Sequence, residues 1–287
     1  MALALNVDGR EVEVAEGASV REACAAAGVT VPTLCYNDGF TPANACRLCV
    51  VELEGSRTLV AACSRPAEQG MRVLTASERV RHSRRMVLEF LGSSVDLSLA
   101  AGLAGPLAEY GARPERFGAA AETVAQPPKV DNPLYVRDYS KCVLCYRCVQ
   151  ACGSEAQNTF AIWVSGRGFE ARIATEYDAA LPDSACVYCG NCVQACPTGA
   201  LSFKSEYDLR QAGTWDQSRQ AQTTTICPYC GVGCSLELLV QDNQVVRVSS
   251  PAGHDITRGN LCIKGRFGTQ APEGAGVARR FPARPPS

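Results

Sequence analysis

The sequence predicts the α+β fold class, with several small domains in place of one large core. Aromatic residues make up only 7% of the 287 residues, which is too few for a single large core. Short strand-like and helix-like runs follow one another along the chain and are separated by turn residues. The 17 cysteines are spread over the whole length. Together these observations indicate small domains that are each organised around a metal site.

All cysteines except Cys24 fall into four sets of four. The sets are Cys35, Cys46, Cys49 and Cys63 (the N-terminal set); Cys142, Cys145, Cys148 and Cys152 (run A); Cys186, Cys189, Cys192 and Cys196 (run B); and Cys227, Cys230, Cys234 and Cys262 (the C-terminal set). The chain lacks the basic segment, apolar core and cleavage site of a secretion signal, so we expect a cytoplasmic protein. In such a protein these cysteines are expected to be thiolate metal ligands and not disulfides.

Charge and hydropathy argue against two kinds of partner. The net charge is −1, which gives no reason to expect nucleic acid or an anionic membrane surface. A bilayer span needs roughly 18–20 consecutive apolar residues. The best candidate, residues 95–108, is shorter than that and contains Asp96. We therefore expect no nucleic-acid partner and no membrane span.

Residues 1–76 have the pattern of a small α+β domain. Asp8-Gly9 is a two-residue hairpin turn, and Ser19 with Glu22 forms a capping box at the start of a short helix. Cys24 shares one face of that helix with apolar residues, so we expect it to be buried and not a ligand. Three cysteines of the N-terminal set follow in a loop. Strands are expected at 2–7, 10–14, 50–53 and 58–63.

Residues 77–130 contain no cysteine, and we expect a helix at 78–91 followed by an Ala/Gly/Pro-rich connecting segment. The helix carries four arginines that are expected to form a solvated or docking face: Arg79, Arg81, Arg84 and Arg85. The remaining parts are expected to be a domain at 131–210, a linker at 211–220, a module at 221–272 and a disordered tail at 273–287.

Runs A and B are two copies of one motif, Cys-x2-Cys-x2-Cys-x3-Cys, and both have Val-Gln-Ala before the last cysteine. The doubled run is typical of a bacterial ferredoxin with two [4Fe–4S] clusters, in which the fourth cysteine of each run binds the other cluster. One cluster is therefore expected on Cys142, Cys145, Cys148 and Cys196. The other is expected on Cys186, Cys189, Cys192 and Cys152. Zinc prefers paired Cys-x2-Cys knuckles, which this pattern fits poorly.

The N-terminal set has a ten-residue gap after its first cysteine, where plant-type [2Fe–2S] ferredoxins have four. Its motifs are Pro-Thr-Leu-Cys-Tyr (32–36), Cys-Arg-Leu-Cys-Val (46–50) and Ala-Ala-Cys-Ser-Arg-Pro (61–66). They resemble the β-grasp [2Fe–2S] domain of the large iron–sulfur subunit of respiratory complex I and of related [FeFe] hydrogenase and NAD-linked formate dehydrogenase subunits. The resemblance covers residues 1–90 and 131–210. That family continues with a histidine and three cysteines for a further [4Fe–4S] cluster. Residues 92–100 contain none of these, so we expect that cluster to be absent.

The C-terminal set has a hairpin pattern, 236–240 and 245–248, between its third and fourth cysteines. With Arg258-Gly259 before Cys262 and Lys264 after it, this set resembles the [4Fe–4S] module of molybdenum- or tungsten-bis(pterin) oxidoreductases, formate dehydrogenases included. In that family the matching lysine bridges the cluster and the pterin, which makes Lys264 the candidate cofactor-binding residue. We expect the bis(pterin) catalytic domains on a partner subunit.

Both resemblances imply a non-catalytic iron–sulfur subunit of a multi-subunit oxidoreductase, most closely a split NAD-linked formate dehydrogenase. It would hold one [2Fe–2S] and three [4Fe–4S] clusters and relay electrons between a Mo/W-bis(pterin) subunit and a flavin/NAD subunit. Three alternatives stay open. They are a relay subunit of a hydrogenase or complex I-type NADH dehydrogenase, a relay between a ferredoxin- or NADPH-linked flavoprotein and another bis(pterin) enzyme, and a structural zinc-binding scaffold. Visible absorption separates the last, because zinc proteins are colourless and iron–sulfur proteins are brown.

We predict that the fully loaded chain carries about 14 iron atoms, from one two-iron and three four-iron clusters. Iron and acid-labile sulfide analysis of anaerobically reconstituted protein measures this number. A content of about 18 iron atoms would show a fifth cluster and would contradict the interpretation of residues 92–130.

Overall fold

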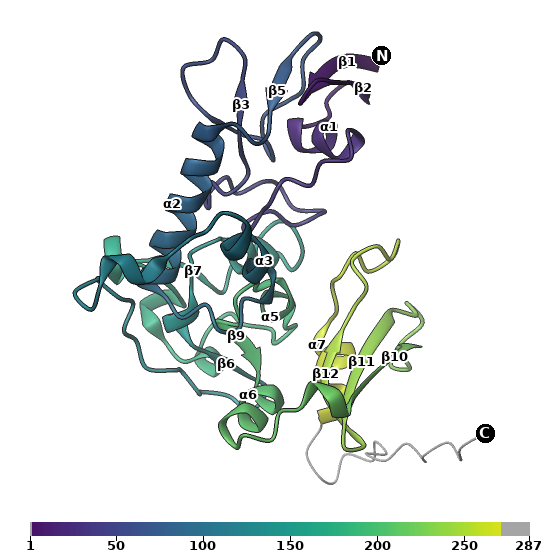
Figure 1. Cartoon of the computed structure of the whole chain (residues 1–287). Helices are drawn as coiled ribbons and strands as arrows, with labels where there is room; N and C mark the ends of the chain where they lie inside the picture. The colour runs from purple at the N-terminus through teal and green to yellow at the C-terminus, as the bar shows by residue number, and fades with distance from the viewer. Residues whose placement is uncertain (1, 271–287) are drawn as a thin grey trace. The chain divides into compact units, whose positions relative to one another are not determined.

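The computed structural model of the chain describes residues 2–270, which form two compact units (Figure 1). Unit 1 consists of the described residues up to Ala125 together with Ser140–Tyr146, and unit 2 of Gln126–Tyr139 together with the described residues from Arg147 onward. Both units combine short helices with small sheets, in agreement with the predicted α+β class. Among the described residues, no helix is long and apolar enough to cross a membrane. The tail predicted at 273–287 lies outside them.

Unit 1 contains a five-stranded mixed sheet in the order β2-β1-β5-β3-β4. Its strands are β1 (Ala2–Val7), β2 (Arg10–Ala15), β3 (Val50–Leu53), β4 (Val60–Ala61) and β5 (Arg72–Leu74). β1 and β2 form the expected hairpin, and its turn residues Asp8 and Gly9 have φ angles of 49° and 86°. Both lie in the left-handed region that a type I′ turn requires. The strand expected at 58–63 is only two residues long. β5, which pairs in parallel with β1, has no counterpart in the prediction.

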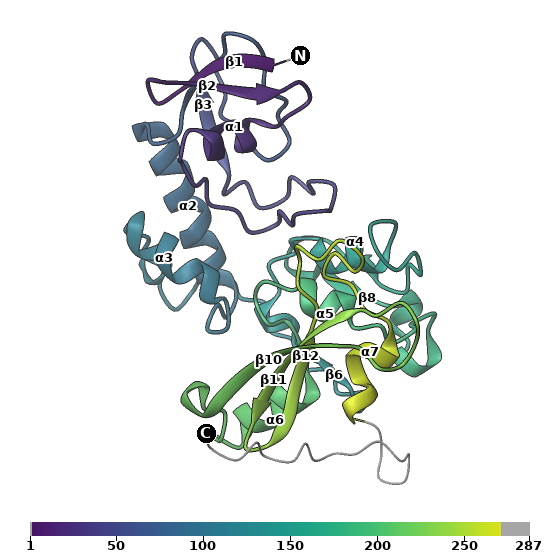
Figure 2. The same ribbon diagram turned by 90° about the vertical axis from the view of Figure 1, so that its right-hand side faces the viewer.

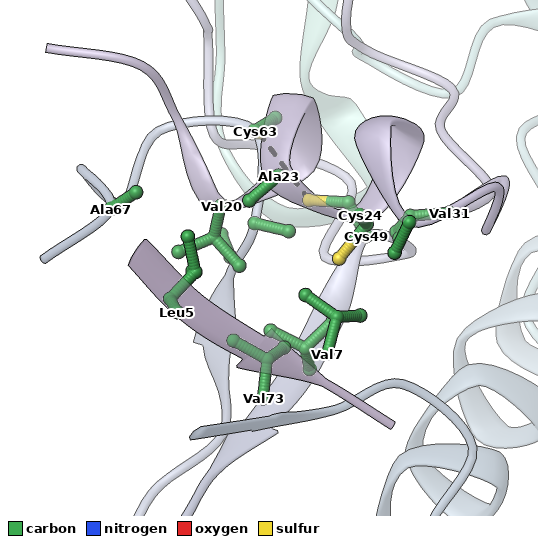
Figure 3. Close-up of a cluster of buried hydrophobic side chains, with 14 residues drawn as sticks. Leu5, Val7, Val20, Ala23, Cys24, Val31, Cys49, Cys63, Ala67 and Val73 are labelled. Carbon is green, nitrogen blue, oxygen red and sulfur yellow. Dashed lines mark hydrogen bonds between the residues drawn. The ribbon is translucent and has the colours of Figure 1, made fainter. Parts of the chain in front are cut away.

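The first hydrophobic core of unit 1 involves this sheet and α1 (Val20–Ala26). The expected capping box is present: the Glu22 N–H donates to Ser19 Oγ at 3.2 Å, and the Ser19 N–H donates to the Glu22 carboxylate at 2.6 Å. Cys24 is fully buried in this core, and burial raises its pKa to about 11 (Figure 3). Cys49 and Cys63 belong to the same core. Apolar side chains therefore enclose two sulfurs of the N-terminal set.

The region 77–130 is more regular than the sequence predicts. α2 extends over Glu78–Ser94 and is followed by α3 (Ala101–Glu109) and a 3-10 helix, η1 (Pro114–Phe117). A second core connects α2 and α3 with the loop of the N-terminal set through the buried residues Leu34, Leu48, Leu88, Ala100, Leu103 and Tyr110. The structure therefore corrects the expectation of a mere connecting segment after the first helix. Periodicity misses α3 because this Ala/Gly-rich helix buries only Leu103 and contains Pro106.

Arg84 is the buried arginine of the expected basic face of α2. Its side chain is only 3% exposed, and it donates to the Val50 carbonyl and to the Tyr110 hydroxyl, both at 2.8 Å. Arg79 and Arg81 are exposed, as a solvated face requires, whereas Arg84 fits the docking alternative, because it contacts Val50 of the domain predicted at 1–76. Because Val50 follows Cys49 directly, Arg84 connects α2 to the strand that begins at the N-terminal set.

Unit 2 contains the helices of both runs, α4 (Arg147–Cys152) and α5 (Asn191–Ala195), which pack against each other. Two antiparallel strand pairs accompany them, β6 (Tyr135–Arg137) with β9 (Leu201–Phe203) and β7 (Trp163–Ser165) with β8 (Arg172–Ala174). Short 3-10 helices complete this part: η3 (Gly168–Glu170), η4 (Glu176–Asp178) and η5 (Leu181–Asp183).

The last part of unit 2 is a three-stranded antiparallel sheet beside a short helix (Figure 2). Its elements are β10 (Gln220–Ile226), β11 (Ser235–Gln241), β12 (Gln244–Ser249) and α7 (Ile263–Phe267). The β11–β12 hairpin agrees with the predicted one, whereas β10 was not predicted. The expected linker corresponds to the connection from α6 (Lys204–Gln211) to β10. It does not separate two independent bodies, because the segments on both sides belong to one compact unit.

We predict that Arg84→Met destabilises the chain by about 2 kcal/mol or more, because it leaves the buried Val50 carbonyl and Tyr110 hydroxyl without their donor. Arg79→Gln is the matched control on the same helix. Its exposed ion pair with Glu52 is worth less than about 1 kcal/mol. Urea unfolding of both variants measures the difference, and equal losses would contradict the buried role of Arg84.

Candidate iron–sulfur sites

The N-terminal set is divided into two close pairs of sulfurs. Cys49 Sγ and Cys63 Sγ lie 3.3 Å apart (Figure 3). The Cys46 backbone N–H donates to Cys35 Sγ at 3.5 Å, and the Cys46 thiol donates a hydrogen bond to the same sulfur. The partner thiols lower the pKa of Cys35 to about 6 and the pKa of Cys49 to about 7. Two irons that each take two thiolates fit this arrangement.

Backbone geometry holds these sulfurs in place. Arg47, between Cys46 and Cys49, has a φ of 56°, in the left-handed region that non-glycine residues rarely adopt. The N–H groups of Ala45 and Cys46 face Cys35 and contribute to lowering its pKa. Backbone donors of this kind stabilise a thiolate, and strained backbone is concentrated at functional sites.

The structure brings Cys152 of run A together with three cysteines of run B. Cys152, Cys186, Cys189 and Cys192 line one hollow, whose empty volume of about 330 Å³ includes space open to solvent. Burial raises the pKa of Cys189 and of Cys192, and the neighbouring thiols of this group raise both further. Cys152 therefore lies where the doubled motif predicts the fourth ligand of the second cluster.

Hydrogen-bond donors surround this hollow. The Tyr135 hydroxyl is 3.1 Å from Cys186 Sγ, and the backbone N–H of Tyr188 donates to the same sulfur at 3.4 Å. Burial raises the pKa of Cys152, and the backbone N–H groups at residues 160–162 oppose that rise. Hydrogen bonds to ligand sulfurs are one of the means by which a protein sets a cluster's reduction potential.

The two runs share one backbone conformation around their second cysteine. Leu144 and Tyr146 flank it in run A, with φ angles of 50° and 66°. Tyr188 and Gly190 flank it in run B, with φ angles of 54° and 70°. Three of these four left-handed residues are not glycine, so the conformation is strained in both copies. Cysteines bound to a common cluster would hold each loop in this shape.

Run A is divided between the two units. Cys142 and Cys145 belong to unit 1, whereas Cys148 and Cys196 belong to unit 2. The ligand set of the first [4Fe–4S] cluster therefore stays a prediction from the motif. Within unit 2, Cys196 Sγ lies 3.8 Å from the Thr198 hydroxyl.

The C-terminal set surrounds the turn between β10 and β11 and the start of α7. The Cys227 N–H donates to the Cys234 carbonyl at 2.8 Å, and Cys262 is the N-cap residue of α7. Cys227 is buried, whereas Cys230 and Cys262 are exposed. Burial raises the pKa of Cys234, and the thiols of the other three cysteines raise it further, so these three thiols lie near Cys234. An all-thiolate set of four fits a [4Fe–4S] cluster.

Lys264 is exposed on α7, two residues after Cys262, so its ammonium group is accessible from solvent. Its role toward a pterin stays a prediction.

Across the described part of the chain, no group of three or more His, Cys, Asp or Glu side chains is arranged to hold a single metal ion.

Two residues next to the run B set were not singled out from the sequence. Tyr135 is 51 residues away from Cys186 in the chain. Arg266 belongs to α7 and donates from Nε to the Cys189 carbonyl at 3.2 Å. The sequence holds one indication of the Arg266 contact, which is a difference between the two runs. Run B has Gly190-Asn191 where run A has Tyr-Arg at 146–147.

Three families match successive parts of the chain. Residues 1–78 match the 2Fe-2S iron-sulfur cluster binding domain. Residues 132–202 match the ferredoxin-like domain of NADH-quinone oxidoreductase subunit 3, and residues 220–271 match the molybdopterin oxidoreductase Fe4S4 domain. The three matched segments contain the N-terminal set, runs A and B, and the C-terminal set, respectively.

Curated relatives match nearly the whole chain. NADPH-Fe(3+) oxidoreductase subunit alpha of Geobacter sulfurreducens is 36% identical over 282 residues, which cover 93% of this chain and 31% of the relative. A subunit of the NADH-quinone oxidoreductase of Rhizobium meliloti is 32% identical over 278 residues, which cover 92% of this chain and 31% of the relative. The chain thus spans about a third of the length of these relatives.

A solved structure of an NAD+-reducing [NiFe]-hydrogenase in the H2-reduced state matches with a TM-score of 0.58 and 27% identity, over 70% of this chain and 87% of that chain. Together, the matches identify the iron–sulfur N-terminal domains of one family, which includes subunits of NADH-quinone oxidoreductases, NADPH-Fe(3+) oxidoreductases and hydrogenases. The chain carries [2Fe–2S] and [4Fe–4S] domains of this family. None of these relatives is named as a formate dehydrogenase, so that finer assignment is a proposal.

We predict that Tyr135→Phe lowers the reduction potential of a [4Fe–4S] cluster without loss of iron. The Tyr135 hydroxyl bonds Cys186 Sγ, and a donor to a ligand sulfur stabilises the reduced form. Tyr188→Phe is the control, because Tyr188 approaches the same sulfur through its backbone N–H. EPR-monitored redox titration compares the two variants. An unchanged potential in Tyr135→Phe, or the same shift in both variants, would contradict this role.

Proposed function

We propose that this chain is an iron–sulfur electron-transfer subunit of an NADH- or NADPH-linked oxidoreductase complex. The observation that carries the proposal is the succession of four cysteine sets over three matched cluster domains. When bound, the clusters would supply one-electron redox chemistry. The residues of the chain would hold them through thiolates, exclude water by burial, as at Cys49 and Cys63, and direct N–H and O–H donors at the sulfurs.

The finer proposal is an NAD-linked formate dehydrogenase, with a Mo/W-bis(pterin) subunit on one side and a flavin/NAD subunit on the other. The match of residues 220–271 to a molybdopterin oxidoreductase domain supports a bis(pterin) partner. Within this proposal, the first domain adopts a β-grasp ferredoxin fold and runs A and B form a two-cluster bacterial ferredoxin fold.

A second candidate is a relay in a complex I-type dehydrogenase, a hydrogenase or an NADPH-linked oxidoreductase. The identities of 32% and 36% to subunits of enzymes with these names, and the hydrogenase structure, favour it. Anaerobic affinity purification of the tagged chain from its native cells, with identification of the co-purifying subunits, separates the candidates. Bis(pterin) and flavin subunits support the finer proposal, whereas a nickel–iron partner supports a hydrogenase. A colourless chain that contains zinc would contradict both.

We predict that Lys264→Met slows reduction of this chain's clusters by the substrate of the bis(pterin) partner, with iron content unchanged. The reason is that Lys264 is an exposed cation two residues beyond the last ligand of the C-terminal set. Lys204→Met, which removes an i,i+4 pair with Asp208 on α6, is the matched control. Stopped-flow reduction of the assembled complex measures both variants. Wild-type rates for Lys264→Met would remove Lys264 from the electron path.

A further inference from the structure

Among the described residues of unit 2, Arg266 is the most deeply buried cation, with a relative exposure of 0%. Its guanidinium makes four hydrogen bonds. Nε donates to the Cys189 carbonyl at 3.2 Å, and Nη2 donates to Asn191 Oδ1 at 2.8 Å. Nη1 donates to the Val248 carbonyl at 3.0 Å and also to Gln194 Oε1. Every nitrogen is satisfied, but each acceptor is a neutral carbonyl or amide oxygen.

The charge of Arg266 is therefore not compensated by its hydrogen-bond partners. Among the described residues, no carboxylate forms an ion pair with it. Burying a cation without a counter-charge costs several kcal/mol, on the order of the values found for broken buried ion pairs. Cysteines of two sets contact this residue: Nε donates to the Cys189 carbonyl, and the Arg266 backbone N–H donates to the Cys262 carbonyl at 3.0 Å. The sulfurs of Cys189, Cys192 and Cys262 also act on its charge. Thiolates at these cysteines would supply the negative charge that this position requires.

Run B differs from run A at the positions that receive Arg266. Gly190 has a φ of 70°, and a Cβ built on it would lie 3.0 Å from Arg266 Cγ and from the Phe267 ring. The tyrosine at the equivalent position of run A, Tyr146, would not fit there. Asn191, in place of Arg147, accepts from Arg266 and also from the Leu261 N–H at 2.9 Å.

The same face of α5 binds the sheet of the last part of the chain. Gln194 Nε2 donates to the Ser250 carbonyl at 2.8 Å, and the Ser250 N–H donates back to Gln194 Oε1 at 3.2 Å. Run B is thus built to hold the C-terminal part of unit 2, and Arg266 bonds residues on both sides of the contact.

We propose that Arg266 is a cation shared by two cluster sites, the run B set with Cys152 and the C-terminal set, and that it raises the reduction potential of the clusters bound there. Reduction adds one electron to a cluster, and a buried positive charge beside it stabilises the added charge because the surroundings screen it weakly. The proposal rests on the proposed function only in that clusters occupy these sites. Arg266 is a positioning residue, because it acts on the clusters through the residues that ligate them.

The test is an EPR-monitored redox titration of the full-length, anaerobically reconstituted chain. Iron and sulfide analysis precedes each titration, so that failure of cluster binding, and with it of the proposed function, is recognised separately. Arg266→Gln removes the charge and is expected to lower the potential of at least one [4Fe–4S] signal. Arg266→Lys keeps the charge and is expected to stay near the wild-type potential. Arg219→Gln removes an exposed arginine paired with Asp242 and is expected to leave all potentials unchanged.

A second variant keeps the test decisive if Arg266→Gln fails to fold. Gln194→Glu places a carboxylate on Arg266 Nη1 and keeps the hydrogen bond that Arg266 donates, so it neutralises the cation without removing a side chain. It gives up the hydrogen bond from Gln194 Nε2 to the Ser250 carbonyl. It is expected to shift the same signal downward. Wild-type potentials in iron-loaded Arg266→Gln or Gln194→Glu would overturn the proposal. So would a shift in Arg266→Lys or Arg219→Gln as large as the shift in Arg266→Gln.

Discussion

The close approach of cysteine sulfurs is the constraint on which the rest of the structure depends. Cys49 Sγ and Cys63 Sγ lie 3.3 Å apart inside the same core that contains Leu5 and Val73 (Figure 3). Two thiolates this close repel each other unless a positive centre lies between them. The hydrophobic core and the ligand set are therefore one structure, and an apolar core alone would not favour this arrangement. A chain with few aromatic residues can fold around such sites because metal–thiolate bonds supply folding free energy.

Local signals in the sequence were sufficient for much of the fold. The Asp8-Gly9 turn and the Ser19–Glu22 capping box depend on neighbouring residues only, and both are present as expected. β5 and β10 could not be predicted in the same way. β5 is three residues long and is defined by its pairing with β1 and β3, whereas β10 is polar and mostly exposed. For such strands the partner, and not the local pattern, determines the conformation.

In the candidate sites too, some features follow from the local sequence and others depend on tertiary packing. Spacing alone predicts the cysteine ligands, because a cluster needs ligands at short fixed intervals, and it also predicts that Cys152 joins run B, with which it lines one hollow. Residues that act on these sulfurs from other elements leave no such pattern. Tyr135 comes from β6 and Arg266 from α7, and each reaches run B only through tertiary packing. Arg84 is similar: a basic helix face is compatible with solvent or with docking, and only the contacts with Tyr110 and Val50 show that this side chain is buried.

The two copies of the internal repeat obtain a neighbouring cation in different ways. Run A has a cation within its own loop, Arg147, where run B has the neutral Asn191. Run B instead receives Arg266 from 75 residues further along the chain. Its local charge therefore depends on α7 and β12 being packed against α5. If the arginine acts as proposed, the potential of the run B cluster depends on one docking contact, whereas the loop of run A carries its own cation. A difference in potential between neighbouring clusters gives electron transfer its direction, so the packing of α7 against α5 would bear on that direction.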